Sequence, residues 1–122
     1  TGTNPPLSIS KLFKDQYGEG ITGRVKQVAL NGETVAFATD KNTLCTFNLS
    51  KGFLTKMETD AEVINLGFNG NTLIYLTKNG ELYQMSHNSD SPQLLASRIR
   101  HFTVEDGILA WGSDSIFVSM NG

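Results

Sequence analysis

The sequence predicts an all-β fold of antiparallel meanders, each with three to four strands, repeated about every 38 residues. The segment Val25–Phe47 recurs without insertion as Val63–Met85, 38 residues further along the chain. Both copies carry an Asn-Gly pair, Asn31-Gly32 and Asn69-Gly70, between runs in which apolar residues alternate with other residues. Asn-Gly accepts the two positive φ angles of a type I′ turn, so each pair predicts a β-hairpin. Self-similarity at a fixed spacing of about 20–50 residues is typical of stacked supersecondary units.

The first repeat contains three clear strands and a possible fourth. Alternation predicts strands over residues 25–30 and 33–39, joined by the Asn-Gly turn. Asp40-Lys41-Asn42 predicts a second turn, after which residues 44–49 form a third strand. Residues 53–57 supply a short segment that fits a fourth strand. The repeat is therefore a meander that continues into the next copy.

The second repeat has the same elements, and a third copy follows it in altered form. The second predicts strands over 66–68, 73–76 and 82–85, with 94–97 as a further segment. The third begins at Ile99, turns at Asp106-Gly107, and replaces Lys78-Asn79-Gly80-Glu81 with Ser113-Asp114-Ser115. We predict an N-terminal arm with a Gly-rich connection over 1–23, then repeats over about 24–60, 61–97 and 98–122.

Period-2 alternation also predicts which residues form the apolar layers. The predicted core comprises Val28, Leu30, Val35, Phe37, Leu44, Leu66, Phe68, Leu73, Tyr75, Leu82, Val104, Leu109, Trp111 and Ile116. In the arm, Ser8 to Lys14 fits either a short helix or a strand.

Composition excludes several functional classes. With a net charge of −2 and a pI near 5.6, the chain has no overall positive potential that would attract a phosphate backbone. We therefore predict no nucleic-acid partner. No apolar run approaches the roughly 20 residues that span a bilayer, so we predict no membrane partner. The single Cys45 lies in an apolar strand pattern and predicts a buried reduced thiol. That thiol favours a reducing, cytoplasmic location.

No constellation of residues predicts catalysis, a metal site or a cofactor. Residues 18–23 read G-x-G-x-x-G, but Ala38 stands where a phosphate-pairing Lys would be needed, so we interpret them as a flexible connection. His87 and His101 have no second ligand at a metal spacing. No Ser is framed as G-x-S-x-G, and we predict that the protein is not an enzyme.

Meanders repeating at about 40 residues are the blades of a β-propeller. Residues 25–29 and 43–47, with Asn79-Gly80-Glu81-Leu82-Tyr83 and residues 91–102, resemble RCC1-type repeats. Glu33 or Asn71 replaces the His that follows the glycine turn in that family. The same strands are similar to a divergent WD40-like blade without its Trp-Asp or Gly-His pair. The resemblance covers about residues 22–122 and implies a propeller of about three blades.

In both families the propeller is mainly a platform for proteins, and the resemblance implies a non-catalytic interaction scaffold. A first alternative is a module for glycans or small ligands that binds them between blades and is completed by oligomerisation. A second is an RCC1-like regulator of a small GTPase. Binding residues concentrate in loops on a rigid scaffold. The candidate partner-binding residues are Asp40, Lys41, Asn42, Lys78, Asn79, Gly80, His87, Asp90 and Asp114.

Three blades are fewer than the four to eight that a closed propeller commonly has. We therefore expect further blades in cis, within a longer chain, or in trans, from an oligomer. The start at Thr1 and the end at Gly122 favour a fragment over an oligomer protomer.

Overall fold

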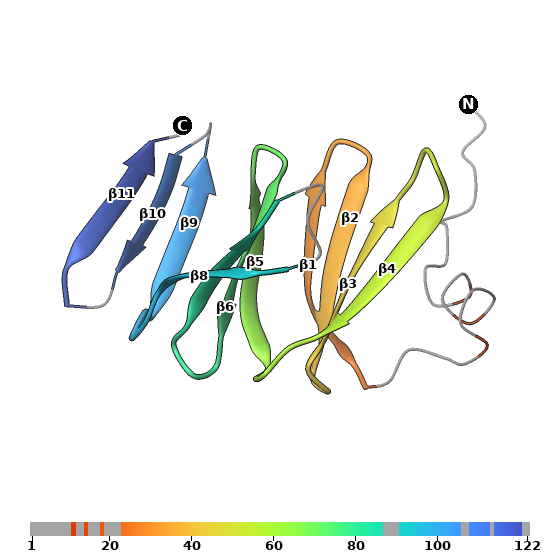
Figure 1. The fold of residues 1–122 in the computed structure, drawn as a ribbon, viewed down its shortest axis with the longest axis horizontal. Coiled ribbons are helices and arrows are strands. Elements are labelled where there is room, and N and C mark those ends of the chain that lie inside the picture. Colours follow the sequence, from red (N-terminus) through yellow and green to blue (C-terminus); the bar gives the residue numbers. More distant parts are fainter. Residues whose placement is uncertain are drawn as a thin grey trace, which may run out of the picture.

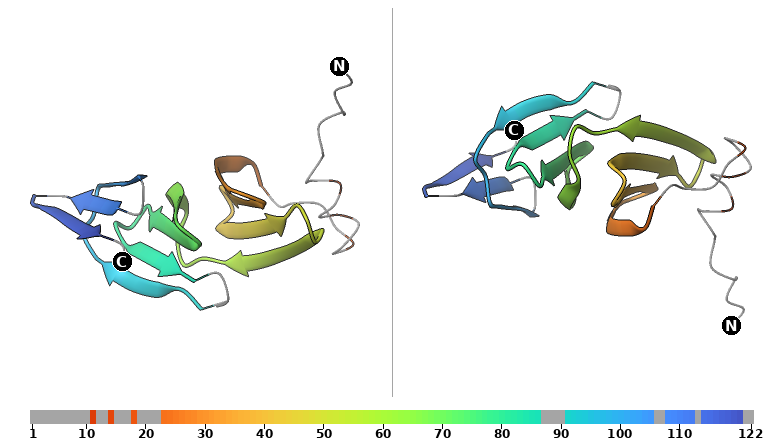
Figure 2. Two further views of the ribbon diagram at one scale, coloured as in Figure 1. Left: turned by 90° about the horizontal axis from the view of Figure 1, so that it is seen from above. Right: turned by 90° about the horizontal axis from the view of Figure 1, so that it is seen from below.

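The computed structural model of the chain describes residues 11, 14, 18, 23–86, 91–105, 108–112 and 114–120. In this part of the chain, eleven strands form three antiparallel sheets of four, four and three strands. Each sheet corresponds to one sequence repeat, and we call the sheets blades 1, 2 and 3. Figure 1 shows them side by side, and Figure 2 shows them fanned when seen from above or below. The all-β prediction is confirmed.

Blade 1 is a meander in which sequence neighbours pair in order. Its strands are β1 (Val25–Asn31), β2 (Thr34–Thr39), β3 (Thr43–Asn48) and β4 (Phe53–Glu58). Blade 2 repeats this order with β5 (Val63–Asn69), β6 (Thr72–Thr77), β7 (Leu82–Met85) and β8 (Gln93–Ala96). Blade 3 contains β9 (His101–Glu105), β10 (Ile108–Gly112) and β11 (Ile116–Met120).

Hairpins form at both predicted places, but the predicted type I′ turn is wrong, because neither Asn31 nor Asn69 has a positive φ angle and the turn residues are Gly32-Glu33 and Gly70-Asn71. Asn31 pairs with Thr34, and Asn69 pairs with Thr72, which leaves two residues in each turn. Gly32 and Gly70 have φ angles of 54° and 60°, a region that glycine adopts without steric cost. A register shift also occurs at equivalent places in β1 and β5. The repeat therefore preserves the irregularities of the strands as well as their lengths.

Each blade has a back face, turned toward the preceding blade in the sequence, and a forward face, turned toward the next. The forward face of blade 1 supplies Ala36, Ala38 and Leu44 to a buried cluster. Blade 2 supplies its back-face residues to the same cluster, including Leu66, Leu73 and Tyr75, together with Val63. Burying a side chain such as Leu contributes about 1.5–3 kcal/mol, so this cluster holds the two blades together.

Blades 2 and 3 meet in the same manner. Ile74, Leu76 and Leu82 on the forward face of blade 2 cluster with Phe102 and Leu109 of blade 3. Gly67 in β5 allows this approach, because a Cβ there would lie 3.3 Å from a side-chain methyl carbon of blade 3. The fold thus consists of two successive blade–blade contacts of one kind.

Three predicted core residues are exposed, and for them the prediction is wrong. Val28, Leu30 and Ile116 are 65%, 66% and 82% exposed. Val28 and Leu30 lie on the back face of blade 1, and Ile116 lies on the forward face of blade 3. Among the described residues, no further blade packs against either face. Of the other eleven, Phe37, Leu44, Leu66, Leu73, Tyr75, Leu82 and Leu109 are buried, and Val35, Phe68, Val104 and Trp111 are partly buried.

Cys45 is fully buried in β3, as its sequence pattern predicts. It clusters with Phe37, Phe47 and Leu54. Burial raises the pKa of its thiol to about 11, although the Lys56 ammonium opposes the rise. The thiol is therefore protonated and shielded at neutral pH. Most of the predicted arm lies outside the described residues, and within the described ranges no helix is long and apolar enough to cross a membrane.

We predict that the free energy of unfolding decreases as the pH rises from about 9 to about 11. The thiol ionises near pH 9 in the unfolded chain but only near pH 11 in the folded one, so its stabilising contribution is complete below pH 9 and is lost above it. Urea unfolding at pH 8 and pH 10.5 measures the change. Cys45→Ala should show a smaller decrease than wild type, and equal decreases in the two proteins would contradict the assignment.

Candidate functional site

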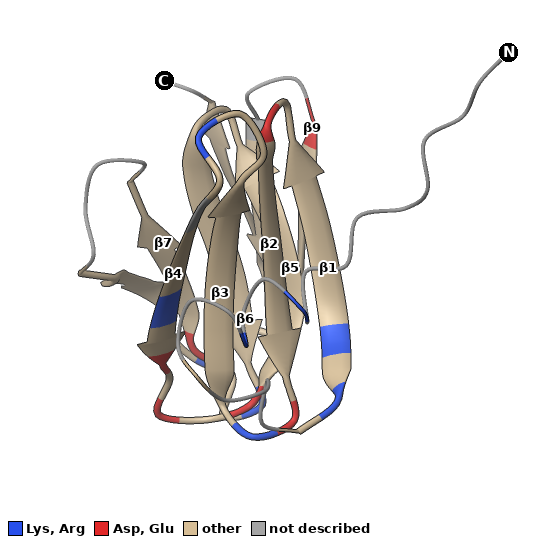
Figure 3. Ribbon diagram, turned by 90° about the vertical axis from the view of Figure 1, so that its right-hand side faces the viewer, with Lys and Arg blue, Asp and Glu red and all other residues tan. Residues whose placement is uncertain are grey.

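The predicted turn residues lie along one edge of the fold. The β2–β3, β6–β7 and β10–β11 turns occupy equivalent places in the three meanders and lie at the lower edge in Figure 1. Lys41, Lys78, Asn79 and Asp114 are exposed there. Figure 3 shows charged residues of both signs at this edge. We call these four residues the lower-edge set.

Asp40 has a structural role in its turn. Its Oδ1 accepts a hydrogen bond from the Arg24 backbone N–H at 2.9 Å, and its own N–H donates to the Arg24 carbonyl at 2.9 Å. The equivalent bond in blade 2 runs from the Lys78 N–H to the Glu62 carbonyl at 2.7 Å. These turns are therefore hydrogen bonded to the residue that precedes the first strand of each blade, Arg24 in blade 1 and Glu62 in blade 2.

Asn42 and Gly80 also have structural roles, because each turn holds the connection to the next blade. The Asn42 carbonyl accepts from the Thr59 N–H, and the Gly80 carbonyl accepts from the Ile99 N–H, each at 2.8 Å. Both turn residues have positive φ angles, 61° and 83°. Within the predicted site, the lower-edge set is exposed, whereas Asp40, Asn42 and Gly80 are partly buried. His87 and Asp90 lie outside the described residues.

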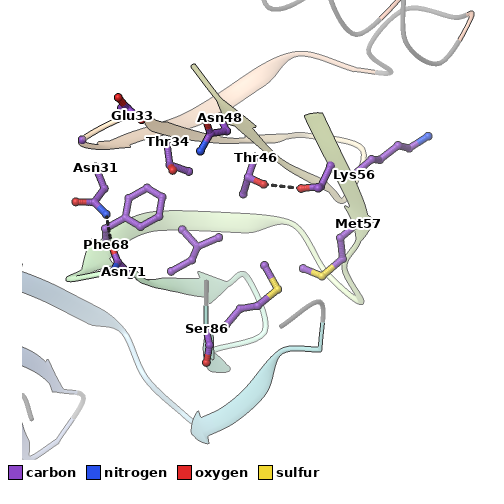
Figure 4. A pocket seen from close by; sticks show the side chains of 14 residues that line it. Asn31, Glu33, Thr34, Thr46, Asn48, Lys56, Met57, Phe68, Asn71 and Ser86 are labelled. Carbon is purple, nitrogen blue, oxygen red and sulfur yellow. Dashed lines mark hydrogen bonds between the residues drawn. The ribbon is translucent and has the colours of Figure 1, made fainter. Parts of the chain in front are cut away.

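A cleft of about 530 Å³ lies between blades 1 and 2, and no pattern in the sequence predicts it. Its volume is in the range of small-molecule sites. One wall carries polar groups of blade 1, including Thr34, Thr46 and Asn48, whereas the other carries Phe68 and Leu73 of blade 2 (Figure 4). Its lining also includes Asn31, Gly32, Glu33, Thr55, Lys56, Met57, Asn71, Met85 and Ser86.

The blade 1 wall carries short side chains at a pair of positions where the equivalent face of blade 2, which is turned toward blade 3, carries long ones. Thr46 pairs with Thr55 across β3 and β4, and their hydroxyl groups are hydrogen bonded. Gln84 and Gln93 are the equivalent pair in blade 2, and their longer side chains bond at 3.0 Å. The threonines leave space beside blade 1 that glutamines would reduce. The difference between threonines and glutamines can be read from the sequence, but the space between blades 1 and 2 cannot.

Asn31 closes the rim of the cleft at the upper edge. Its Nδ2 donates to the Gly70 carbonyl at 2.8 Å and to Asn71 Oδ1 at 3.4 Å. The side chain of the first Asn-Gly turn thereby joins blade 1 to the corresponding hairpin of blade 2. The rim is a fixed feature formed by two repeats together.

The cleft suits binding of a nearly neutral molecule. Among the described residues that line it, Glu33 and Lys56 are the charged ones, and amide and hydroxyl groups dominate its polar wall. Within the described residues, no group of three His, Cys, Asp or Glu side chains is arranged to hold a metal ion.

The pKa of Tyr83, outside the cleft, is raised by burial and by the Glu81 carboxylate, to which its hydroxyl donates at 3.2 Å.

Comparisons with known proteins identify the fold. No protein-family model matches the sequence, and no curated protein shows significant similarity to it. BamB from Moraxella catarrhalis is 15% identical with a TM-score of 0.67, over 85% of this chain and 37% of its own. The N-terminal domain of Nup159 is 24% identical with a TM-score of 0.61, over 76% of this chain and 25% of its own.

A computationally designed protein, Ika4, is similar over nearly its whole length. It is 15% identical with a TM-score of 0.57, and the match covers 85% of this chain and 95% of that one. BamB and the Nup159 domain are propeller proteins, and at these identities the likeness concerns the fold alone. The described strands are three successive blades of β-propeller type. The chain spans between a quarter and two fifths of the BamB and Nup159 chains.

We predict that Asn31→Ala lowers the free energy of unfolding by about 1 kcal/mol, because it removes the hydrogen bond from Nδ2 to the Gly70 carbonyl. Asn71→Ala is the matched control, since it removes only the longer 3.4 Å contact and should cost less. Urea unfolding of the three proteins measures both changes. Equal losses would show that the amide does not join the blades as described.

Proposed function

We propose that this chain is a non-catalytic β-propeller segment that binds a protein partner through its inter-strand turns. The observation that carries the proposal is the lower-edge set, in which exposed Lys41, Lys78 and Asp114 occupy equivalent turns of three packed blades. The bonds around Asp40, Asn42 and Gly80 hold these turns against the scaffold. A fixed turn loses little conformational entropy when it binds, which favours recognition.

The charges of the lower-edge set indicate the chemistry of the partner. Two ammonium groups and one carboxylate on successive blades fit a surface with acidic and basic groups at matching spacing. Nup159 is found in an S. cerevisiae complex described as Dbp5 bound to Nup159, with Gle1 H337R, IP6 and ADP. That precedent supports a partner-binding role for a fold of this type. Regulation of a small GTPase in the manner of RCC1 stays a prediction.

We predict that replacing Lys41, Lys78 and Asp114 together with Ala weakens partner binding at least about tenfold while the free energy of unfolding changes by less than about 0.5 kcal/mol. Affinity capture identifies the partner, and titration of the purified partner measures the dissociation constant.

The matched control replaces Lys26, Lys51 and Glu33 with Ala. These residues are also exposed, and their removal changes the net charge equally, but Lys51 and Glu33 lie in turns at the opposite edge and Lys26 lies within β1. The control should bind as wild type does. Unchanged binding by the lower-edge variant would rule out this edge as the interaction surface.

A second candidate function is binding of a sugar or another small polyhydroxylated ligand, and the cleft between blades 1 and 2 favours it. Its hydroxyl and amide wall offers donors and acceptors for ligand hydroxyl groups. Its opposite wall offers the partly buried Phe68, against which the apolar face of a sugar can stack. The ligand would lie between blades 1 and 2.

We predict that Thr34→Val abolishes most ligand-induced thermal stabilisation, because it removes a hydroxyl of the cleft while keeping the side-chain shape. A glycan array identifies the ligand, and thermal unfolding with increasing ligand measures binding. Thr72→Val changes the equivalent threonine of blade 2, outside the cleft lining, and should respond as wild type does. Absence of any array or thermal response would remove this candidate function.

A further inference from the structure

The blade 1 wall of the cleft carries three kinds of side chain in a fixed order. Thr34 pairs with Asn48, and Thr46 pairs with Thr55. Residues two apart on a strand lie on the same face, about 7 Å from each other. Asn48 and Thr46 are therefore neighbours on β3, and Met57 follows Thr55 on β4 in the same way. The wall changes along these strands from an amide, through a pair of hydroxyl groups, to a thioether.

Asn48 presents hydrogen-bond donors to the cleft. Its Oδ1 accepts from the backbone N–H groups of Ser50 at 3.0 Å and Lys51 at 2.8 Å. These two bonds fix the orientation of the amide, and Figure 4 shows its nitrogen on the side of the other lining residues. In the described part of the chain, no buried side-chain nitrogen or oxygen lacks a partner, so the Asn48 Nδ2 is accessible to a ligand. Both of its N–H groups are donors.

The hydroxyl groups of Thr46 and Thr55 complement an amide. They are hydrogen bonded to each other, so one of them donates and the other accepts. The pair keeps one O–H hydrogen and has lone pairs on both oxygens. A secondary amide has one acceptor, its carbonyl oxygen, and one donor, its N–H. Such a group satisfies the donor and an acceptor of the pair together.

Two methionines form an apolar corner beyond the hydroxyl pair. Met57 comes from β4 of blade 1, and Met85 comes from the end of β7 of blade 2. Both are partly buried and pack against the apolar cluster that joins the two blades. A methionine side chain is flexible and polarizable, so it can adapt to a small apolar group. An amide held by the hydroxyl pair can place a methyl group in this corner.

The charged lining residues favour a neutral ligand. Lys56 pairs with Cys45, so it lies on the face of blade 1 opposite to Thr46 and Thr55. Figure 4 shows its side chain extending away from the other lining side chains. Glu33 is the other charged residue among the described lining, and a carboxylate does not attract an anion.

We propose that the cleft binds a neutral N-acetylated sugar, a hexosamine whose acetamido group contacts the Thr46–Thr55 pair. The acetyl methyl lies against Met57 and Met85, the ring stacks on Phe68, and ring hydroxyl groups accept from Asn48. The proposal rests on the second candidate function, binding of a sugar in this cleft, and specifies the class of sugar.

Isothermal titration of the 122-residue chain with two matched pairs of sugars tests the proposal. One pair is N-acetylglucosamine and glucose, and the other is N-acetylgalactosamine and galactose. In at least one pair the N-acetylated member should bind at least about tenfold more tightly, because only it satisfies the hydroxyl pair and fills the apolar corner. Nε-acetyl-lysine carries the same acetamido group without the ring. It should bind more weakly than the N-acetylated sugar, because it cannot stack on Phe68.

Thr55→Val removes one hydroxyl of the pair and keeps the shape of the side chain. Thr55 is exposed, so the variant should fold. It should lose the preference for the N-acetylated sugar and keep the affinity of wild type for the plain sugar. The matched control is Gln93→Ala, because Gln93 occupies the equivalent place in blade 2, outside the cleft lining. This control should keep the preference.

Met57→Ala tests the apolar corner through a gain of binding. Wild type should bind N-acetylglucosamine more tightly than N-butanoylglucosamine, because the corner accommodates a methyl group. The smaller alanine leaves room for the longer acyl chain, so the variant should reverse this order. Circular dichroism checks that the variant is folded.

Four results would overturn the proposal. Equal binding of both members in the two sugar pairs would show that the acetamido group is not recognised, although sugar binding as such would stand. Tighter binding of Nε-acetyl-lysine than of either N-acetylated sugar would show that the ligand is not a sugar. An unchanged order of acyl chains in folded Met57→Ala would show that the acetyl group lies elsewhere. Absence of binding by every sugar would remove the second candidate function together with this proposal.

Discussion

Packing between blades is the constraint on which the rest of this structure depends. Blade 2 carries apolar residues on both faces, and a sheet cannot bury both faces by its own strand pairing. Leu66, Leu73 and Tyr75 are buried against blade 1, and Ile74, Leu76 and Leu82 are buried against blade 3. A substitution on either face therefore affects two blades, and each blade depends on its neighbours for stability.

The turns follow from the same constraint. At one edge, the carbonyls of Asn42 and Gly80 hold the chain as it leaves for the next blade. At the other edge, Asn31 donates across to the neighbouring hairpin. Turn residues such as Asn42, Gly80 and Asn31 thus reverse the direction of the chain and also form hydrogen bonds that join neighbouring blades. The side chains of Lys41 and Lys78 are left exposed at these turns.

The cleft between blades 1 and 2 shows how a repeat protein acquires a distinctive site. The backbone repeats closely, but Thr46 and Thr55 stand where blade 2 has Gln84 and Gln93. Shorter side chains at two facing positions leave room beside the strands. One contact between blades thereby becomes a place where a molecule of moderate size can bind, without any change of fold.

Most strands could be predicted from the sequence because strand pairing in a meander is local. Alternation and the two Asn-Gly turns determine which residues pair, and the 38-residue repeat determines how many meanders there are. The predicted turn residues that the structure describes lie along one edge, and three of them also form hydrogen bonds within the scaffold. Alternation alone could not show that Asp40, Asn42 and Gly80 bond to segments far along the chain, and His87 and Asp90 lie outside the described residues.

The sequence by itself determined the strand order, the places of the turns and the two-sided apolar character of each blade, because these depend on neighbouring residues. Only the tertiary structure decided which apolar residues are buried. Val28 and Leu66 occupy equivalent positions, yet Leu66 is buried and Val28 is exposed. The physical reason is that burial requires a second surface, and the sequence of one strand carries no information on whether another blade packs against it.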